Sequence, residues 1–148
     1  MGTHYKGTKK EVRALNTYIK IIRAADSLRS RVNMHLSKTG LTESQFSVLD
    51  ALYHLGPLTQ KDLGIKLLKS GGNITMVIDN IERRKLVIRE RGEKDRRLIN
   101  VNLTSNGKNI IENILPEQVS RIKNEFNTLS KGEQNELQKL CKKIGVSV

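Results

Sequence analysis

The sequence has one cysteine, two prolines and no tryptophan among its 148 residues, and each scarcity excludes a class of protein. A lone cysteine, Cys141, cannot form a disulfide within the chain, which argues for a reducing compartment. Three tyrosines and two phenylalanines are few for a protein that stacks on single-stranded bases. No apolar run approaches the roughly 20 residues that a membrane-spanning helix requires, and the opening MGTHYKG has no apolar signal core. These absences predict a cytoplasmic protein.

Positive charge is what the sequence has in excess. Lysine and arginine number 27 against 15 acidic residues, so the net charge is +12 and the isoelectric point is about 10.0. The basic residues are spread along the chain, so they are expected to decorate a folded surface rather than a disordered tail. A polyanion is therefore the expected partner, either nucleic acid or, as the alternative, an anionic membrane surface.

Apolar residues recurring at intervals of three and four predict a mainly helical fold. A long amphipathic helix is expected over residues 9–37, and a short helix should bury Leu63, Leu67 and Leu68. Pro116 should kink or interrupt the helix that follows Thr104, because proline removes a backbone donor. The remaining expected helices begin at capping residues or after glycine: from Thr42 with Gln45, from about Asn73 to Lys85, and from Ser130 with Glu133.

A charged β-hairpin is expected between the fourth and fifth helices. Its strands are Val87–Arg91 and Leu98–Leu103, and RERGEKDRRL (residues 89–98) forms its tip. Asp95 stands two residues before Arg97, which suggests a local pair that orients a guanidinium for a narrow minor groove. The neighbouring basic residues would meet phosphates: Arg91, Lys94 and Arg96. The alternative is a solvated tip with weak exposed ion pairs.

The order of helix, short helix, helix and hairpin predicts a winged helix-turn-helix. The fourth helix would enter the major groove with its N-terminal residues, and small side chains there would let the backbone approach phosphate. Gly71 and Gly72 can alternatively be an ordinary loop. The candidate DNA contacts of this helix are Ser70, Gly71, Gly72, Asn73, Thr75, Met76, Arg83 and Arg84.

Several segments together resemble the MarR (multiple antibiotic resistance regulator) family of bacterial transcription factors, from about Val12 to Ile144. The most specific is DRRLINVNLTSNG (95–107), in which five residues match the family pattern: Asp95, Arg97, Leu103, Thr104 and Gly107. The other segments are LTESQFSVLDAL (41–52), LTQKDLGIKL (58–67) and SGGNITMVIDNIERRKLV (70–87).

The resemblance implies a homodimeric winged-helix repressor at a palindromic operator. Arg97, oriented by Asp95, would reach the minor groove, and the helix from Ser70 to Arg84 would lie in the major groove. A single domain, 1–148, would comprise a DNA-binding region (41–104) and dimerisation helices (9–37 and 105–146). Apolar stripes left over on these end helices independently favour a helical dimer interface.

Many members of the family release DNA when a small phenolic or other aromatic compound binds. Residues 74–82 resemble a branch whose regulators respond to quinones and related phenols. Weak candidates for lining an effector pocket, each also explained by core or interface packing, are Tyr18, Met34, Phe46, Tyr53 and His54. The alternative is an architectural or virulence-type regulator with no small-molecule effector.

The remaining chemistry-bearing residues favour no catalysis and no cofactor. Cys141 lies on the stripe of the last helix, so packing as a small buried hydrophobe is favoured over redox sensing. The three histidines, His4, His35 and His54, have no metal-ligand spacing. No nucleophile–base pair or phosphate-binding loop supports an enzyme.

Overall fold

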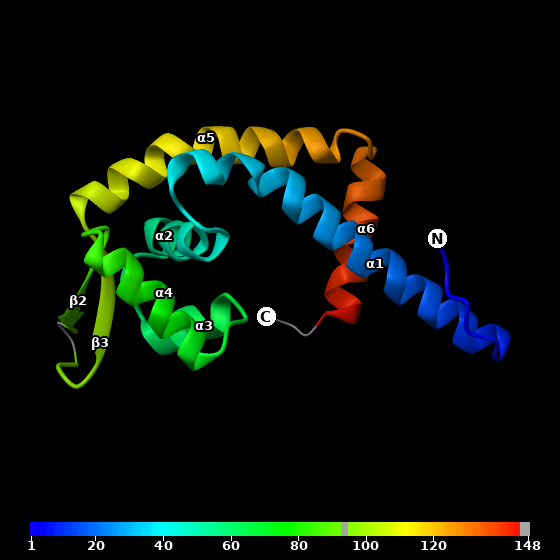
Figure 1. Cartoon of the computed structure of the whole chain (residues 1–148), viewed down its shortest axis with the longest axis horizontal. Helices are drawn as coiled ribbons and strands as arrows, with labels where there is room; N and C mark the ends of the chain where they lie inside the picture. Colours follow the sequence, from blue (N-terminus) through cyan, green and yellow to red (C-terminus); the bar gives the residue numbers. More distant parts are fainter. Residues whose placement is uncertain (93–94, 146–148) are drawn as a thin grey trace. The chain divides into compact units, whose positions relative to one another are not determined.

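A computed structural model describes residues 1–92 and 95–145. The chain divides into two compact units, Met1–His35 and Leu36–Val148, and each is described by itself. In chain order the elements are α1 (Lys9–Asn33), η1 (Met34–Thr39), α2 (Glu43–Leu55), β1 (Leu58–Thr59), α3 (Gln60–Lys66), α4 (Gly71–Arg83), β2 (Val87–Arg91), β3 (Ile99–Leu103), α5 (Ser105–Phe126) and α6 (Lys131–Ile144). The expected class, mainly helical with a small β wing, is confirmed (Figure 1).

The first unit is a single long helix with an ordered N-terminal end. Thr8 and Glu11 form a capping box, in which the Thr8 hydroxyl accepts from the Glu11 amide and Glu11 accepts from the Thr8 amide at 2.7 Å. The α-helix ends at Asn33, four residues earlier than the expected end of the 9–37 segment. A 3₁₀ helix, η1, carries the remainder up to Gly40, whose φ of 72° ends the helical run.

In the second unit, side-chain caps set where α2, α3 and α4 begin. Thr42 and Gln45 form the expected capping box of α2, and Thr59 accepts a hydrogen bond from the Asp62 amide at the start of α3. Ser70 caps α4 in the same way, through the Asn73 amide. Helix α4 therefore begins two residues earlier than expected, and Gly71 and Gly72 belong to its first turn rather than to a break.

The break between α3 and α4 lies at Leu68. Its φ is 51°, a left-handed conformation that reverses the chain direction, and its side chain is 77% exposed. The expectation that Leu68 points inward is therefore wrong, whereas Leu63 is fully buried and Leu67 is partly buried against the core. A helix that ends at Lys66 cannot carry an inward stripe as far as Leu68.

Three antiparallel strands form one sheet in the order β1-β3-β2. The hairpin of β2 and β3 has the expected place, with Val87 opposite Leu103 and Arg91 opposite Ile99. The two-residue strand β1 pairs with β3 and was not expected from the sequence, because so short a segment has no periodicity of its own. The hairpin projects beside α4 (Figure 1).

The core of the second unit joins the helix-turn-helix to the hairpin and to α5. Leu49, Leu63, Ile78 and Ile81 are fully buried in it, and Val101 from β3 and Ile111 from α5 pack into the same cluster. Such burial stabilises each aliphatic side chain by roughly 1.5–3 kcal/mol relative to exposure. This common core holds α4 and the β2–β3 hairpin on one scaffold.

Helices α5 and α6 extend from this core. Pro116 was expected to kink or interrupt helix α5, which is not interrupted there. Pro116 is exposed. Ser130 and Glu133 form the expected capping box of α6. None of the described residues of α6 is buried, and Leu137, Leu140 and Ile144 are all exposed. Its apolar stripe is therefore exposed over the part of the chain that the structure describes.

Candidate nucleic-acid interface

The N-terminus of α4 is an open surface suited to a phosphate. Ser70, Gly71, Gly72 and Asn73 are all exposed, and the first turn contains no acidic residue that would offset the helix dipole. A Cβ added to either glycine would meet no heavy atom within 4 Å. Internal packing therefore does not require these glycines, and the absence of a side chain at both leaves the first turn of α4 open to an approaching group.

One turn further along α4, Thr75 and Met76 differ in what they offer. Met76 is 61% exposed, so its side chain is available to an apolar group such as a thymine methyl. Thr75 is half-buried, and its hydroxyl donates to the Gly71 carbonyl oxygen at 2.8 Å while accepting from the Gln60 amide. The hydroxyl hydrogen is thus already used within the protein.

The two arginines at the C-terminal end of α4 have partners within the protein. Arg83 donates to the Asn80 side chain at 2.8 Å, within the same helix. Arg84 donates to the Gly40 carbonyl oxygen at 2.8 Å and to the Gln45 side chain at 3.3 Å. Arg84 therefore braces the end of α4 against the turn that precedes α2.

At the wing tip, Asp95 and Arg97 form the expected pair. The Arg97 Nε and NH2 groups donate to the two carboxylate oxygens at 3.1 and 3.0 Å, and the Arg97 amide donates to the same carboxylate at 3.0 Å. These bonds to Arg97 hold the pKa of Asp95 below its ordinary value and raise the pKa of Arg97. The Arg97 side chain is nevertheless 90% exposed, so it is oriented without being enclosed.

The other expected wing contacts, Arg91, Lys94 and Arg96, all precede Arg97 in the sequence. Arg91 ends β2 and Arg96 precedes Arg97, and both are exposed. Lys94 falls outside the described residues. Gly92 was not among the predicted site residues, but its amide donates to the Leu98 carbonyl oxygen at 2.9 Å. A Cβ there would lie 2.7 Å from the Asp95 carbonyl oxygen, so glycine permits the close turn that presents Arg97.

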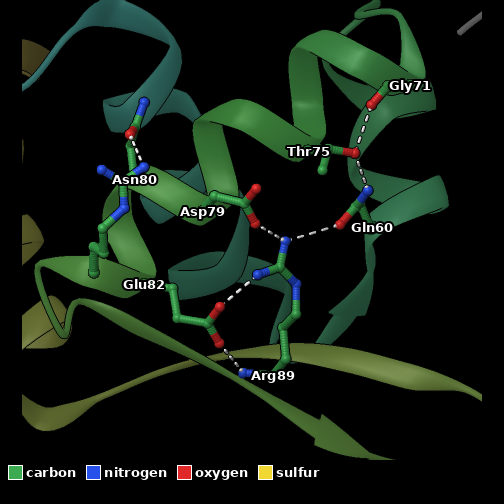
Figure 2. A network of polar contacts seen from close by, with 8 residues as sticks. Gln60, Gly71, Thr75, Asp79, Asn80, Glu82 and Arg89 are labelled. Carbon is green, nitrogen blue, oxygen red and sulfur yellow. Dashed lines mark hydrogen bonds and ion pairs between the residues drawn. The ribbon is translucent and has the colours of Figure 1, made fainter.

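Arg89 is a second residue that sequence reasoning missed. It lies at the base of the wing and joins Asp79 and Glu82 of α4 to Gln60 of α3 (Figure 2). The alternation of strand residues could have identified Arg89 as an inward-facing residue. It shares a strand face with buried Val87 and stands opposite buried Val101. A charged residue at an inward strand position needs partners, which the sequence alone does not identify.

The effector candidates are divided between the two units. Tyr18 and Met34 belong to the first unit, where both are exposed. Phe46 is part of the core of the second unit. Tyr53 and His54 lie together on α2, with ring centroids 5.1 Å apart and the rings nearly perpendicular.

Tyr53 and His54 each also have an acidic partner. The Tyr53 hydroxyl donates to Glu112 at 3.2 Å, and the His54 ring lies 3.3 Å from the Asp50 carboxylate. Hydrogen bonding to Glu112 raises the pKa of Tyr53. Burial raises the pKa of Asp50, while His54 acts in the opposite direction. This small cluster could meet a polar ligand, but Phe46 contributes to the core instead.

Cys141 is exposed, so the expectation that it is a buried packing residue is wrong for the single chain. It borders a hollow of about 410 Å³ between α5 and α6, together with Ile122, Phe126 and Leu137. The reason is that the described residues of the second unit leave the apolar side of α6 exposed, with only α5 beside it. Over residues 1–92 and 95–145, no group of three potential metal ligands is brought together, and no helix is long and apolar enough to cross a membrane.

Comparison with known proteins identifies the family. A model of the MarR family matches residues 39–98. The regulator MhqR of Bacillus subtilis is 31% identical over 91% of this chain and 93% of its own length. The chain belongs to the MarR family. It is a DNA-binding transcriptional regulator rather than an enzyme, and the β2–β3 hairpin is the wing of its winged helix-turn-helix fold.

Another Bacillus subtilis protein, the uncharacterized HTH-type transcriptional regulator YkoM, is 36% identical over 90% of this chain and 87% of its own length. Among solved structures, the MarR family regulator AbsC from Streptomyces coelicolor superimposes with a TM-score of 0.79 at 26% identity, covering 95% of both chains.

Two further structures share the fold at lower identity. MepR of S. aureus, solved in complex with DNA, has a TM-score of 0.76 at 22% identity and covers 94% of this chain and 97% of its own. CouR from Rhodococcus jostii, solved with bound p-coumaroyl-CoA, has a TM-score of 0.82 at 19% identity and covers 90% of this chain and 94% of its own.

Proposed function

We propose that this regulator is a homodimeric repressor that binds a palindromic operator and is released from it by a small aromatic or phenolic ligand. The observation that carries the DNA-reading part is the exposed wing-tip Arg97, held at both carboxylate oxygens by Asp95. Such a regulator acts on the chromosome and therefore in the cytoplasm.

In this proposal the open N-terminus of α4 enters the major groove. Exposed backbone amides at Gly71 and Gly72 meet a phosphate, while Asn73 and Met76 meet base edges. Arg97 enters the adjacent minor groove, where a narrow A·T-rich segment concentrates negative potential. Exposed Arg91 and Arg96 neutralise phosphates. MepR, which shares this fold, has been solved in complex with DNA, which supports DNA as the partner.

A second copy of the chain is the proposed cover for the apolar surface of α5 and α6. Five large apolar side chains are exposed on these helices: Val119, Ile122, Leu137, Leu140 and Ile144. Contiguous apolar surface of this kind marks interfaces in soluble proteins. Two-fold symmetry would set the two recognition helices about 34–36 Å apart, which is one turn of DNA and accounts for a palindromic operator.

The proposed effector is a small phenol or quinone-like compound. Support comes from CouR, whose solved complex holds a coumaroyl thioester, and from the resemblance of residues 74–82 to phenol- and quinone-responsive regulators. In this chain Tyr53 and His54 are the candidate contacts that lie side by side.

The first test is selection of binding sites from random duplex DNA, followed by affinity measurements over a salt series. Recovery of a palindrome with half-sites about one helical turn apart supports the dimeric regulator. Sedimentation at micromolar concentration should give a dimer. A sedimentation profile showing monomer alone would contradict the symmetric model, and binding with a steep salt dependence but no recovered motif would indicate a nonspecific basic protein.

The effector is tested on the selected operator. A panel of simple phenols, hydroxybenzoates and quinones is titrated into the protein–operator complex, and release is followed by fluorescence anisotropy. A compound that weakens binding should lose its effect in Tyr53→Phe or His54→Ala if these residues contact it. If no compound changes operator affinity, the architectural or virulence-type regulator without an effector becomes the better interpretation.

A further inference from the structure

Arg89 occupies the base of the wing, on the strand face that turns toward α4. Its side chain is 24% exposed, against 90% for Arg97 at the tip of the same hairpin. The Arg89 guanidinium donates to Asp79 at 2.6 Å, to Glu82 and to the Gln60 carbonyl oxygen at 3.2 Å. Its backbone amide also donates to Glu82, at 3.0 Å. One residue of the wing is therefore bonded to both helices of the helix-turn-helix.

The two carboxylates that accept from Arg89 are arranged so that they fix the orientation of α4 as well as its distance from β2. Asp79 and Glu82 are three residues apart on α4, so their carboxylates project from the same face of that helix, one turn apart. Each terminal nitrogen of the Arg89 guanidinium donates to a different carboxylate. The planar, forked guanidinium has two such nitrogens, whereas the ammonium group of a lysine has only one. Apolar packing between α4 and β2 is non-directional, whereas this fork resists rotation of α4 about its own axis.

The network continues from Arg89 to the DNA-facing end of α4. Gln60 accepts from Arg89 through its carbonyl oxygen and donates through its amide nitrogen to the Thr75 hydroxyl. Thr75 in turn donates to the carbonyl oxygen of Gly71, the first residue of α4 (Figure 2). A continuous chain of hydrogen bonds thus runs from the wing, across the start of α3, to the first turn of the recognition helix.

The charge of Arg89 is balanced inside the protein. Burial lowers the pKa of its guanidinium, but the hydrogen bonds and charges of Asp79 and Glu82 outweigh burial, so the net pKa is raised. Two carboxylates face one guanidinium, which leaves no surplus positive charge for a phosphate at this place. Arg89 therefore has the surroundings of a structural guanidinium, unlike Arg91, two residues along the same strand, which is exposed.

We propose that Arg89 is a positioning residue for DNA recognition, which sets the rotation of α4 relative to the wing and thereby aligns Asn73 and Met76 with base edges. The inference rests on the proposed DNA contacts of α4 and the wing. It assigns to Arg89 and Gln60 an effect on sequence discrimination without any contact to DNA.

The test compares affinity for the selected operator with affinity for random duplex DNA, each over a salt series. Arg89→Gln should lower the operator-to-random ratio by about tenfold, which is the effect of one lost base contact, and change the salt slope by well under one unit. Arg91→Gln is the matched control on the same strand. It should lower both affinities alike and reduce the salt slope by about 0.9, the value for one phosphate contact.

The ratio of operator affinity to random-DNA affinity distinguishes a positioning role from a general loss of structure. A partly unfolded preparation loses affinity for both DNAs by the same factor, so its ratio is unchanged. Arg89→Lys should recover part of the ratio, because it restores one ion pair but not the fork. Should Arg89→Gln fail to fold, Gln60→Leu provides the second variant: it removes the bridge to Thr75, leaves the ion pairs of Arg89 intact and should still lower the ratio several-fold.

Two different failures are distinguishable. If the wild-type protein prefers its operator but Arg89→Gln and Gln60→Leu, both folded, keep the full ratio, the positioning role is overturned. A lower salt slope in Arg89→Gln with an unchanged ratio would make Arg89 a phosphate contact instead. If the wild-type protein itself shows no operator preference, the proposed function fails and the inference fails with it.

Discussion

The tip and the base of the wing each contain an arginine paired with carboxylates, and the two pairs differ in what surrounds them. At the tip, Arg97 is bonded to Asp95 two residues away and remains almost fully exposed. At the base, Arg89 is bonded to Asp79 and Glu82 of another element and is largely enclosed. The comparison teaches that the same chemical pair leaves an oriented guanidinium exposed in one setting and joins two elements in the other.

The largest effect is expected where the base of the wing meets α5. A Cβ at Gly107 would lie 2.0 Å from the Leu86 carbonyl oxygen, a backbone atom that cannot move without shifting the start of β2. Gly107→Ala should therefore destabilise the fold by about 3 kcal/mol, through overpacking. The measurement is the midpoint of urea unfolding. Gly132→Ala is the control, because a Cβ there meets nothing within 4 Å; equal midpoints for the two variants would contradict the packing argument.

The next effect concerns the exposed arginine of the tip. Arg97→Ala should weaken operator binding about tenfold or more, with loss of any preference for a narrow minor groove. Thermal stability should fall only slightly, because the Arg97 side chain is 90% exposed and ion pairs of exposed side chains contribute little to stability. Affinity is compared on operators that differ in their A·T content beside the recognition half-site. An unchanged operator affinity would remove the wing tip from the DNA interface.

A smaller effect is expected from the turn that carries Arg97. Gly92→Ala places a Cβ 2.7 Å from the Asp95 carbonyl oxygen, so the turn must widen and the Asp95–Arg97 pair must move. The free energy of unfolding should fall by about 1 kcal/mol, which is much less than for Gly107→Ala. Operator affinity should fall several-fold. Calorimetry and anisotropy on the same preparation measure both. If stability falls as far as in Gly107→Ala, the tip is part of the cooperative core.

The smallest effect is a shift in titration. Hydrogen bonds from Arg97 lower the folded-state pKa of Asp95, so the pair persists as pH falls through the ordinary aspartate range and is lost only below it. The contribution of the Asp95–Arg97 pair to stability is thus present above the pKa that Asp95 has in the unfolded chain. It disappears as pH falls through the pKa of Asp95 in the folded protein. Carboxyl NMR should show the Asp95 midpoint below that of an unpaired aspartate. Arg97→Ala should return it to the ordinary value.

The sequence alone determined most of the local structure, because the interactions concerned are close along the chain. Thr42 with Gln45 and Ser130 with Glu133 are caps three residues apart, and both are formed as expected. The Asp95–Arg97 pair spans two residues and is also formed as expected. Regular alternation located the hairpin for the same reason, since side chains on one strand face repeat every second residue.

Tertiary structure decided the features whose partners are distant in sequence. Arg89 meets Gln60 across 29 positions, and β1 exists because β3 lies beside it. Cys141 has the sequence surroundings of a buried residue, yet it is exposed because no described element of the second unit covers its side of α6. Local patterns state which faces are apolar or charged, but only the packed chain determines which of those faces meet and which remain exposed.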